Sequence, residues 1–122
     1  MKINNSFEPE DFKVSITDGI PILKFNIFRA TVKEVKPFQQ HLTHLMSSNH
    51  RFIIIDFTDC AFIDSAIVGV MLTVIKDIRK NNGDIITVTS PGTVDTVFSQ
   101  TGLNRIFKKF PSVSTALLSI NA

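Results

Sequence analysis

The sequence predicts an α/β domain with a mostly parallel sheet, an antiparallel hairpin at its N-terminal end, and about four helices that partly cover the sheet. Two observations carry this prediction. Beyond residue 31, stretches with helical spacing alternate with short apolar runs, as in β-α-β units. Residues 52–55 form an unbroken apolar run, which is typical of a strand buried on both faces. We expect one domain spanning residues 1–122, because this length supports one core but not two.

The hairpin is predicted from residues 12–27. We expect the polar residues 1–11 before it to be loosely ordered. Apolar and polar side chains alternate over residues 12–17, which indicates a half-buried strand. Asp18 and Gly19 then favour a tight turn, and Pro21 lies near the start of the return strand, where a missing N–H does least harm.

The start of the first helix has two interpretations. Residues 31–34 match a capping box, but a helix that begins there has Pro37 in its second turn. Alternatively, Pro37 is the first helical residue. We expect the helix to end near residues 47–49, and we interpret His41 and His44 as surface residues because no third metal ligand accompanies them. Four residues share its apolar face: Val35, Phe38, Leu42 and Leu45.

The centre of the chain is the segment 52–80. A polar step at residues 58–60 follows the buried strand, and Asp64-Ser65 begins a long helical pattern that Asn81-Asn82-Gly83 ends. Ser65 therefore lies at a helix N-terminus, where free N–H groups and the positive end of the helix dipole gather. The simplest interpretation is that Asp64 or Ser65 is the N-cap. Most of the helix circumference is apolar: Ile67, Val68, Val70, Met71, Leu72, Val74, Ile75 and Ile78.

The remaining elements are shorter. Residues 84–88 predict a second parallel strand. We expect Thr93 to cap a short helix that ends at Thr101-Gly102. Ile106-Phe107 is predicted to form a brief edge strand guarded by Lys108-Lys109, and Pro111-Ser112 to introduce a last helix.

Composition excludes several classes of function. The net charge of +2 and the scattered basic residues argue against nucleic-acid binding. The single cysteine, Cys60, allows no internal disulfide and fits a reducing compartment. Because no signal peptide or apolar span is apparent, we expect a cytoplasmic protein without direct membrane insertion. Nucleotide-binding, hydrolase and metal-cluster motifs are absent, so we expect no cofactor, no metal and no enzymatic activity.

Residues 62–66, Phe-Ile-Asp-Ser-Ala, lead to Gly69 and, with residues 97–107 and the last helix, resemble the STAS family, typified by bacterial anti-sigma-factor antagonists. The resemblance covers nearly the whole chain. It implies that an anti-sigma-factor serine kinase binds the chain and phosphorylates Ser65, which ends the binding and so regulates transcription. Ile67-Val68 replace the family's usual Gly-Leu, and residues 27–33 contain no Asp. The implied partner-binding residues are Asp64, Ser65, Ala66, Ile67 and Gly69.

Two other functions stay open from the sequence. A STAS subunit that never receives phosphate could scaffold a larger assembly, such as the ATPase complex of a transporter, with an exposed Ile67 as its docking residue. A STAS domain that binds GTP or ATP is a further alternative. Besides a kinase or a related protein, a second copy of the chain is a candidate partner.

Overall fold

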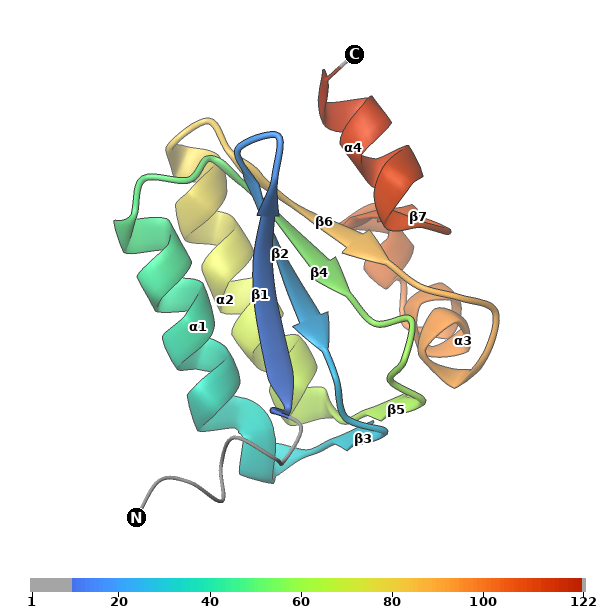
Figure 1. Ribbon diagram of the computed structural model, residues 1–122. Helices are drawn as coiled ribbons and strands as arrows, with labels where there is room; N and C mark the ends of the chain where they lie inside the picture. Colours follow the sequence, from blue (N-terminus) through green and yellow to red (C-terminus); the bar gives the residue numbers. More distant parts are fainter. Residues whose placement is uncertain (1–9, 122) are drawn as a thin grey trace.

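The computed structural model describes residues 10–121, and its main sheet is mixed (Figure 1). Within these residues the main sheet has five strands in the order β1-β2-β4-β6-β7. Only β1 and β2 pair antiparallel; the other neighbours are parallel. This confirms the predicted α/β fold with an N-terminal hairpin. The strands are β1 (Phe12–Thr17), β2 (Ile20–Phe25), β4 (Phe52–Asp56), β6 (Asp84–Val88) and β7 (Lys108–Phe110).

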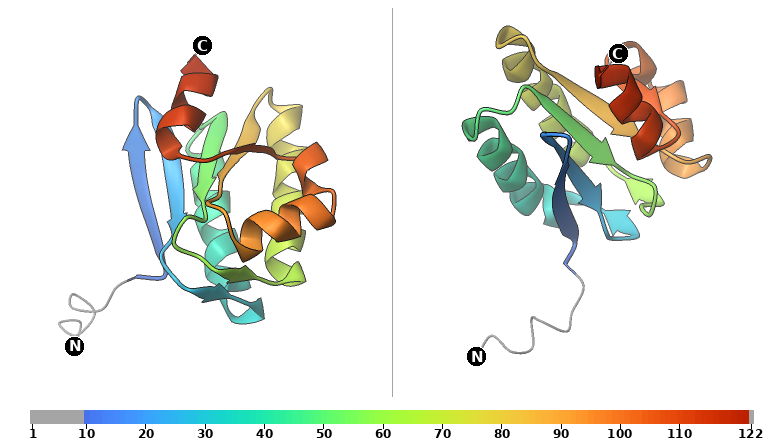
Figure 2. Two further views of the ribbon diagram at one scale, coloured as in Figure 1. Left: turned by 90° about the vertical axis from the view of Figure 1, so that its right-hand side faces the viewer. Right: turned by 45° about the horizontal axis from the view of Figure 1, so that its top comes forward.

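Helices cover both faces of the sheet, but unequally (Figure 2). The helices α1 (Val35–Ser47), α2 (Ser65–Lys80) and α3 (Thr93–Gln100) contribute to one large core, whereas α4 (Val113–Asn121) packs alone on the other face. Strand β4 shows why the central run is wholly apolar: Ile53 and Ile55 enter the large core, and Ile54 packs under α4.

The turn between β1 and β2 is the predicted one. Asp18 and Gly19 both have positive φ, 54° and 78°, as a two-residue type I′ turn requires. Pro21 lies before the first residue of β2 that pairs with β4, so its missing N–H interrupts no parallel pairing. The carbonyls of Glu10 and Asp11 accept hydrogen bonds from Asn26. The rest of the segment predicted to be loosely ordered, residues 1–9, lies outside the described residues.

The prediction of a half-buried first strand is wrong for two of its apolar residues. Phe12 is buried, but Val14 and Ile16 are 39% and 58% exposed. The physical reason is position, since β1 is an edge strand and the helices nearest to it in the large core reach Phe12 but leave the outer side chains uncovered.

The structure supports the capping box of the first interpretation and the later helix start of the second, but not a start at Pro37. Thr31 and Glu34 do form a reciprocal capping box, but they cap a 3₁₀ turn, η2 (Val32–Glu34). The α-helix proper begins at Val35, so Pro37 is neither its first residue nor in its second turn. Pro37 lies in the first turn, where a backbone N–H would have no intrahelical partner. The predicted face is confirmed, with Phe38, Leu42 and Leu45 buried and Val35 packed against them.

Two predictions near the C-terminus are wrong in detail. Gly92, not Thr93, is the N-cap of α3. The last strand lies at 108–110 rather than 106–107, because the N–H groups of residues 106 and 107 donate to the carbonyl of Leu103 at the end of a second 3₁₀ turn, η3 (Leu103–Arg105). Phe107 is 1% exposed and packs near Phe98, so it is a core residue. Gly102, with φ of 78°, has the predicted left-handed conformation after α3.

A second, smaller pairing was not predicted. Strands β3 (Arg29–Ala30) and β5 (Phe62–Ile63) form a parallel two-stranded sheet. It joins the segment after β2 to the segment that leads into α2, and it therefore determines what surrounds the start of that helix.

Candidate functional site

Asp64 organises the start of α2. It is the N-cap residue, and its Oδ1 accepts hydrogen bonds from the backbone N–H groups of Ala66 and Ile67, at 3.0 and 3.4 Å. Its Oδ2 accepts another from the N–H of Val32, at 3.1 Å. The carboxylate therefore caps the helix and also fixes the beginning of η2. Of the two caps that the sequence allowed, the structure has Asp64.

The side chain of Ser65 has no structural role at the start of α2. It is the first residue of α2 and is exposed. Asp64 already accepts from the first free N–H groups of the helix, so the fold does not require the Ser65 hydroxyl as a cap. Within residues 10–121 this hydroxyl forms no hydrogen bond. Ser65 is thus an accessible hydroxyl held at the positive end of a long, well-anchored helix.

The five predicted partner-binding residues do not share one surface. Ser65 and Gly69 are exposed, and Asp64 and Ala66 are half-buried. Ile67, however, is 0% exposed and belongs to the large core, so the idea of an exposed docking residue at this position is wrong. The reason is helical geometry: two residues turn the helix by about 200°, which directs Ile67 away from Ser65. The core face continues from Ile67 through Val70, Met71, Val74, Ile75 and Ile78.

The structure adds two exposed apolar residues, on the segment that pairs with the chain leading into α2, that sequence reasoning missed. Phe28 and Val32 are 70% and 69% exposed. The segment that carries them is firmly held, since the carbonyl of Phe28 accepts from the N–H groups of Ala61 and Phe62, and that of Ala30 accepts from the N–H of Asp64. The sequence offered one sign of this surface: Phe28 is an apolar residue that belongs to no predicted strand or helix.

The segment that carries Phe28 and Val32 has two exposed basic residues. Arg29 and Lys33 are exposed, and the Arg29 guanidinium lies 4.4 Å from the centre of the Phe62 ring. Two acidic groups of the same region are engaged in caps: Glu34 accepts from the N–H of Thr31 at 2.7 Å, and Asp64 accepts as described above. The exposed Asp59, which lines a pocket with Phe28, forms an ion pair with Lys24 at 2.9 Å. The surface around the start of α2 therefore combines a free hydroxyl, exposed apolar side chains and exposed cations.

Cys60 lies under this surface and is not a reactive site. It is buried, and its thiol donates to the carbonyl of Phe62 at 3.3 Å. Burial raises the pKa of the Cys60 thiol, although the hydrogen bonds it makes to the backbone act in the opposite direction. The thiol is therefore kept in its neutral form.

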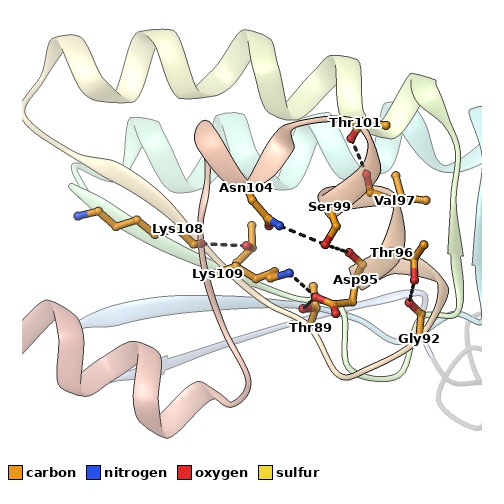
Figure 3. Close-up of polar contacts among 11 residues, drawn as sticks. Thr89, Gly92, Asp95, Thr96, Val97, Ser99, Thr101, Asn104, Lys108 and Lys109 are labelled. Carbon is orange, nitrogen blue, oxygen red and sulfur yellow. Dashed lines mark hydrogen bonds and ion pairs between the residues drawn. The ribbon is translucent and has the colours of Figure 1, made fainter.

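A second polar cluster lies between α3 and the sheet edge (Figure 3). The Lys109 ammonium and the Thr89 hydroxyl both donate to Oδ1 of Asp95. The hydrogen bond from Lys109 is the largest cause that lowers the pKa of Asp95. These groups satisfy one another, so we interpret the cluster as a structural tie between α3 and β7. Within residues 10–121, no three His, Cys, Asp or Glu side chains are grouped to hold a metal ion.

Comparison with known proteins points to one family. A profile for the STAS domain matches residues 12–116. An anti-sigma factor antagonist from Mycobacterium paratuberculosis shares 16% identity, with 91% of this chain and 93% of that chain covered, and a TM-score of 0.83. The anti-sigma factor antagonist SpoIIAA in its unphosphorylated form shares 20% identity, with 90% and 96% covered and a TM-score of 0.74.

The phosphorylated form of SpoIIAA, a cell fate determinant of Bacillus, also matches, with 19% identity, 89% and 98% of the two chains covered, and a TM-score of 0.68. At these identities the likeness shows the fold alone. A search of curated proteins gave no match. In the part of the chain that the structure describes, no helix has the length and apolar character needed to cross a membrane.

Proposed function

Since the chain belongs to the STAS domain family, we propose that it is an interaction module of the anti-sigma-factor-antagonist type. It binds an anti-sigma-factor serine kinase while Ser65 carries a free hydroxyl, and phosphorylation of Ser65 ends the binding. One observation carries the proposal. At the start of α2, Asp64 makes the structural hydrogen bonds and Ser65 is left exposed.

The chemistry of phosphorylation supports this proposal. A phosphate adds a charge of about −1.5 to −2. At a helix N-terminus the fold tolerates this charge, with a favourable dipole interaction of roughly 0.3–1 kcal/mol. The exposed Arg29 and Lys33 add positive charge to the same region. Phosphorylation therefore weakens binding rather than folding, because the phosphate meets a partner surface that is complementary to a neutral hydroxyl.

The structural likeness gives a second line of support. SpoIIAA is an anti-sigma factor antagonist that has been solved in unphosphorylated and phosphorylated forms, and this chain matches both. We carry its mode of regulation over to Ser65 as part of the proposal. Phe28, Val32 and the exposed Gly69 extend the contact surface around the hydroxyl.

Ser65→Asp and Ser65→Ala test the proposal. Binding would be measured by calorimetry against purified anti-sigma-factor serine kinases of the source organism. We expect Ser65→Asp to abolish binding with a melting temperature within about 2 °C of the wild type, because the substitution is favourable for the helix. Ser65→Ala should bind constitutively and resist phosphorylation.

Ser114→Asp is the matched control, because Ser114 is exposed in the first turn of α4. It should leave binding unchanged. Retained binding by Ser65→Asp, or the unfolding of that variant, would contradict the switch. Intact-mass measurement of the protein from its native cells, with fragmentation across residues 60–76, should find phosphate on Ser65.

The exposed apolar pair Phe28 and Val32 also favours a second function, that of a constitutive scaffold subunit in a larger assembly. In that case binding would depend on these two residues and not on the state of Ser65. Phe28→Ser would then abolish the interaction while Ser65→Asp leaves it intact, whereas a phosphorylation switch requires that Ser65→Asp abolish it.

A further inference from the structure

The outer strand β1 presents an ordered row of backbone groups. The N–H of Asn26 donates to the carbonyl of Asp11 at 2.7 Å, in the same register that pairs Lys13 with Lys24 and Ser15 with Ile22. Because bonded and non-bonded pairs alternate in an antiparallel ladder, the odd-numbered residues of β1 bond to β2. The backbone N–H and C=O groups of Phe12, Val14 and Ile16 therefore point outward, and within residues 10–121 they meet no other strand.

The side chains of β1 do not protect this edge. Val14 and Ile16 are 39% and 58% exposed, and the register places them on the face of Leu23, which the large core buries. The opposite edge strand, β7, has three residues, of which Lys108 and Lys109 are two. Short length and two lysines discourage pairing at β7, whereas β1 has six residues, exposed β-branched side chains and a single lysine, Lys13. In the left view of Figure 2, β1 forms the free lateral margin of the sheet.

We propose that β1 pairs antiparallel with β1 of a second copy of this chain, with the two-fold axis at Ser15, so that the two sheets become continuous. In such a pair, opposite residues must lie on the same face, which requires that their numbers differ by an even amount. With Ser15 opposite Ser15, Val14 lies opposite Ile16 of the second copy, and the same contact repeats on the other side of the axis.

This register agrees with both the backbone and the side chains. Val14 and Ile16 carry outward-pointing backbone groups, so each such pair exchanges both N–H···O bonds. Their exposed apolar side chains cover one another, as cross-strand β-branched pairs do. Across the proposed interface Lys13 faces Thr17 of the second copy, so the dimer contact places no like charge opposite it.

The competing register has Val14 on the two-fold axis and is less favourable. It leaves the two copies of Lys13 about 7 Å apart along the strands, whereas the Ser15 register separates them by about 14 Å, at roughly 3.4 Å per residue. It also places the exposed Ile16 opposite Phe12, which is already buried within its own subunit. Charge separation and the covering of exposed apolar side chains therefore both select Ser15.

Cysteine cross-linking tests the register directly. In the proposed dimer the two Ser15 residues form a non-hydrogen-bonded pair with Cα atoms about 4.5 Å apart, within the range of a disulfide. Under mild oxidation Ser15→Cys should form covalent dimers. Thr17→Cys is the matched control, since its two copies would be about 14 Å apart along the strands and should stay uncrosslinked. The wild type should give no cross-link, because Cys60 is buried.

The association itself is measured by sedimentation velocity over a range of concentrations. Val14→Pro removes one outward N–H while keeping the bonds to β2, and edge strands tolerate such a proline. Ile16→Lys adds an unpaired charge. Each should weaken dimerisation by about tenfold or more. Leu118→Lys, on α4 and 70% exposed before substitution, should have no effect.

A wild type that stays monomeric at all concentrations overturns the proposal, as does equal cross-linking of Ser15→Cys and Thr17→Cys. A dimer that Leu118→Lys abolishes while Val14→Pro preserves it would place the interface on α4 and would also overturn it. These outcomes are independent of whether Ser65 is phosphorylated.

Discussion

A single carboxylate, that of Asp64, joins two segments that are 32 positions apart in the chain. One oxygen caps α2 and the other fixes Val32, so the helix start and the exposed apolar residue next to it are held in one arrangement. Because Asp64 already accepts from the backbone N–H groups at the start of α2, the Ser65 hydroxyl is left free. A serine that had to cap the helix itself would have its hydroxyl occupied by backbone N–H groups.

Replacing Ile67 tests how much the first turn of α2 contributes to the stability of the fold. Ile67→Ala should lower the free energy of unfolding by about 2–4 kcal/mol, because the side chain is fully buried and the loss leaves a cavity. Urea titration followed by circular dichroism would measure this. Val68→Ala, at a half-exposed neighbouring position, should cost clearly less. Equal losses at the two positions would contradict the assignment of Ile67 to the core.

At the scale of elements, replacing two glycines by alanine should change the stability of the protein in opposite directions. Gly69 is exposed in the second turn of α2, and a Cβ there would meet nothing within 4 Å beyond its own helix backbone and chain neighbours. Gly69→Ala should therefore stabilise the protein by about 0.5–1 kcal/mol, through better helix propensity. Gly83 lies between α2 and β6, and a Cβ there would be 1.9 Å from the carbonyl oxygen of Arg51.

Gly83→Ala should consequently destabilise the fold by about 2 kcal/mol or more, because backbone and not a flexible side chain would have to move. Thermal unfolding of the two variants beside the wild type decides the matter. A stabilised Gly83→Ala variant would show that the connection relaxes easily. Loss of partner binding by a stabilised Gly69→Ala variant would indicate close approach of the partner at that position.

The sequence was informative wherever one physical pattern dominated a whole element. The buried run of β4, the apolar periodicity of α2, and the Asp18-Gly19 turn each fixed an element with little ambiguity. The two-residue strands β3 and β5 contain no repeat from which a period could be recognised. The prediction placed β7 two residues too early, because the apolar pair Ile106-Phe107 closes a 3₁₀ turn and packs in the core instead of forming a strand.

The candidate site was only partly predictable for the same reason. Ser65 was expected at a helix N-terminus because the helix boundary could be seen in the sequence. Phe28 and Val32 lie next to it only through the β3–β5 pairing and the hydrogen bond to Asp64, which are contacts between distant segments. Ile67 was misplaced because an almost wholly apolar helix does not reveal which of its faces is buried.

At the scale of the whole molecule, the topology places the site at one end of the sheet. Parallel strands share their direction, so the segments that follow β2 and β4 leave the sheet at the same end. The β3–β5 pair then closes these segments together, and α2 starts from it. The proposed dimer edge, by contrast, runs along the outer side of β1. One surface can therefore bind a partner while the other joins two copies.

The stability of the whole fold should also depend on pH through the tie between α3 and β7. Lys109 lowers the pKa of Asp95 below its ordinary value of 3.8. A carboxyl group with a lowered folded-state pKa stabilises the fold above pH 3.8 and loses this contribution as the pH falls through the folded-state value. Because the Asp95 side chain is 35% exposed, solvent screening keeps the contribution small.

Lys109→Met should therefore be slightly less stable than the wild type near neutral pH, with the difference shrinking as the pH falls below 3.8. Urea midpoints measured from pH 7 to pH 3 would show the convergence. Lys76→Met, an exposed lysine on α2, serves as the control and should give a nearly constant difference. A gap between Lys109→Met and the wild type that stays constant over this range would mean that Lys109 stabilises the sheet edge through its aliphatic packing and not through its charge.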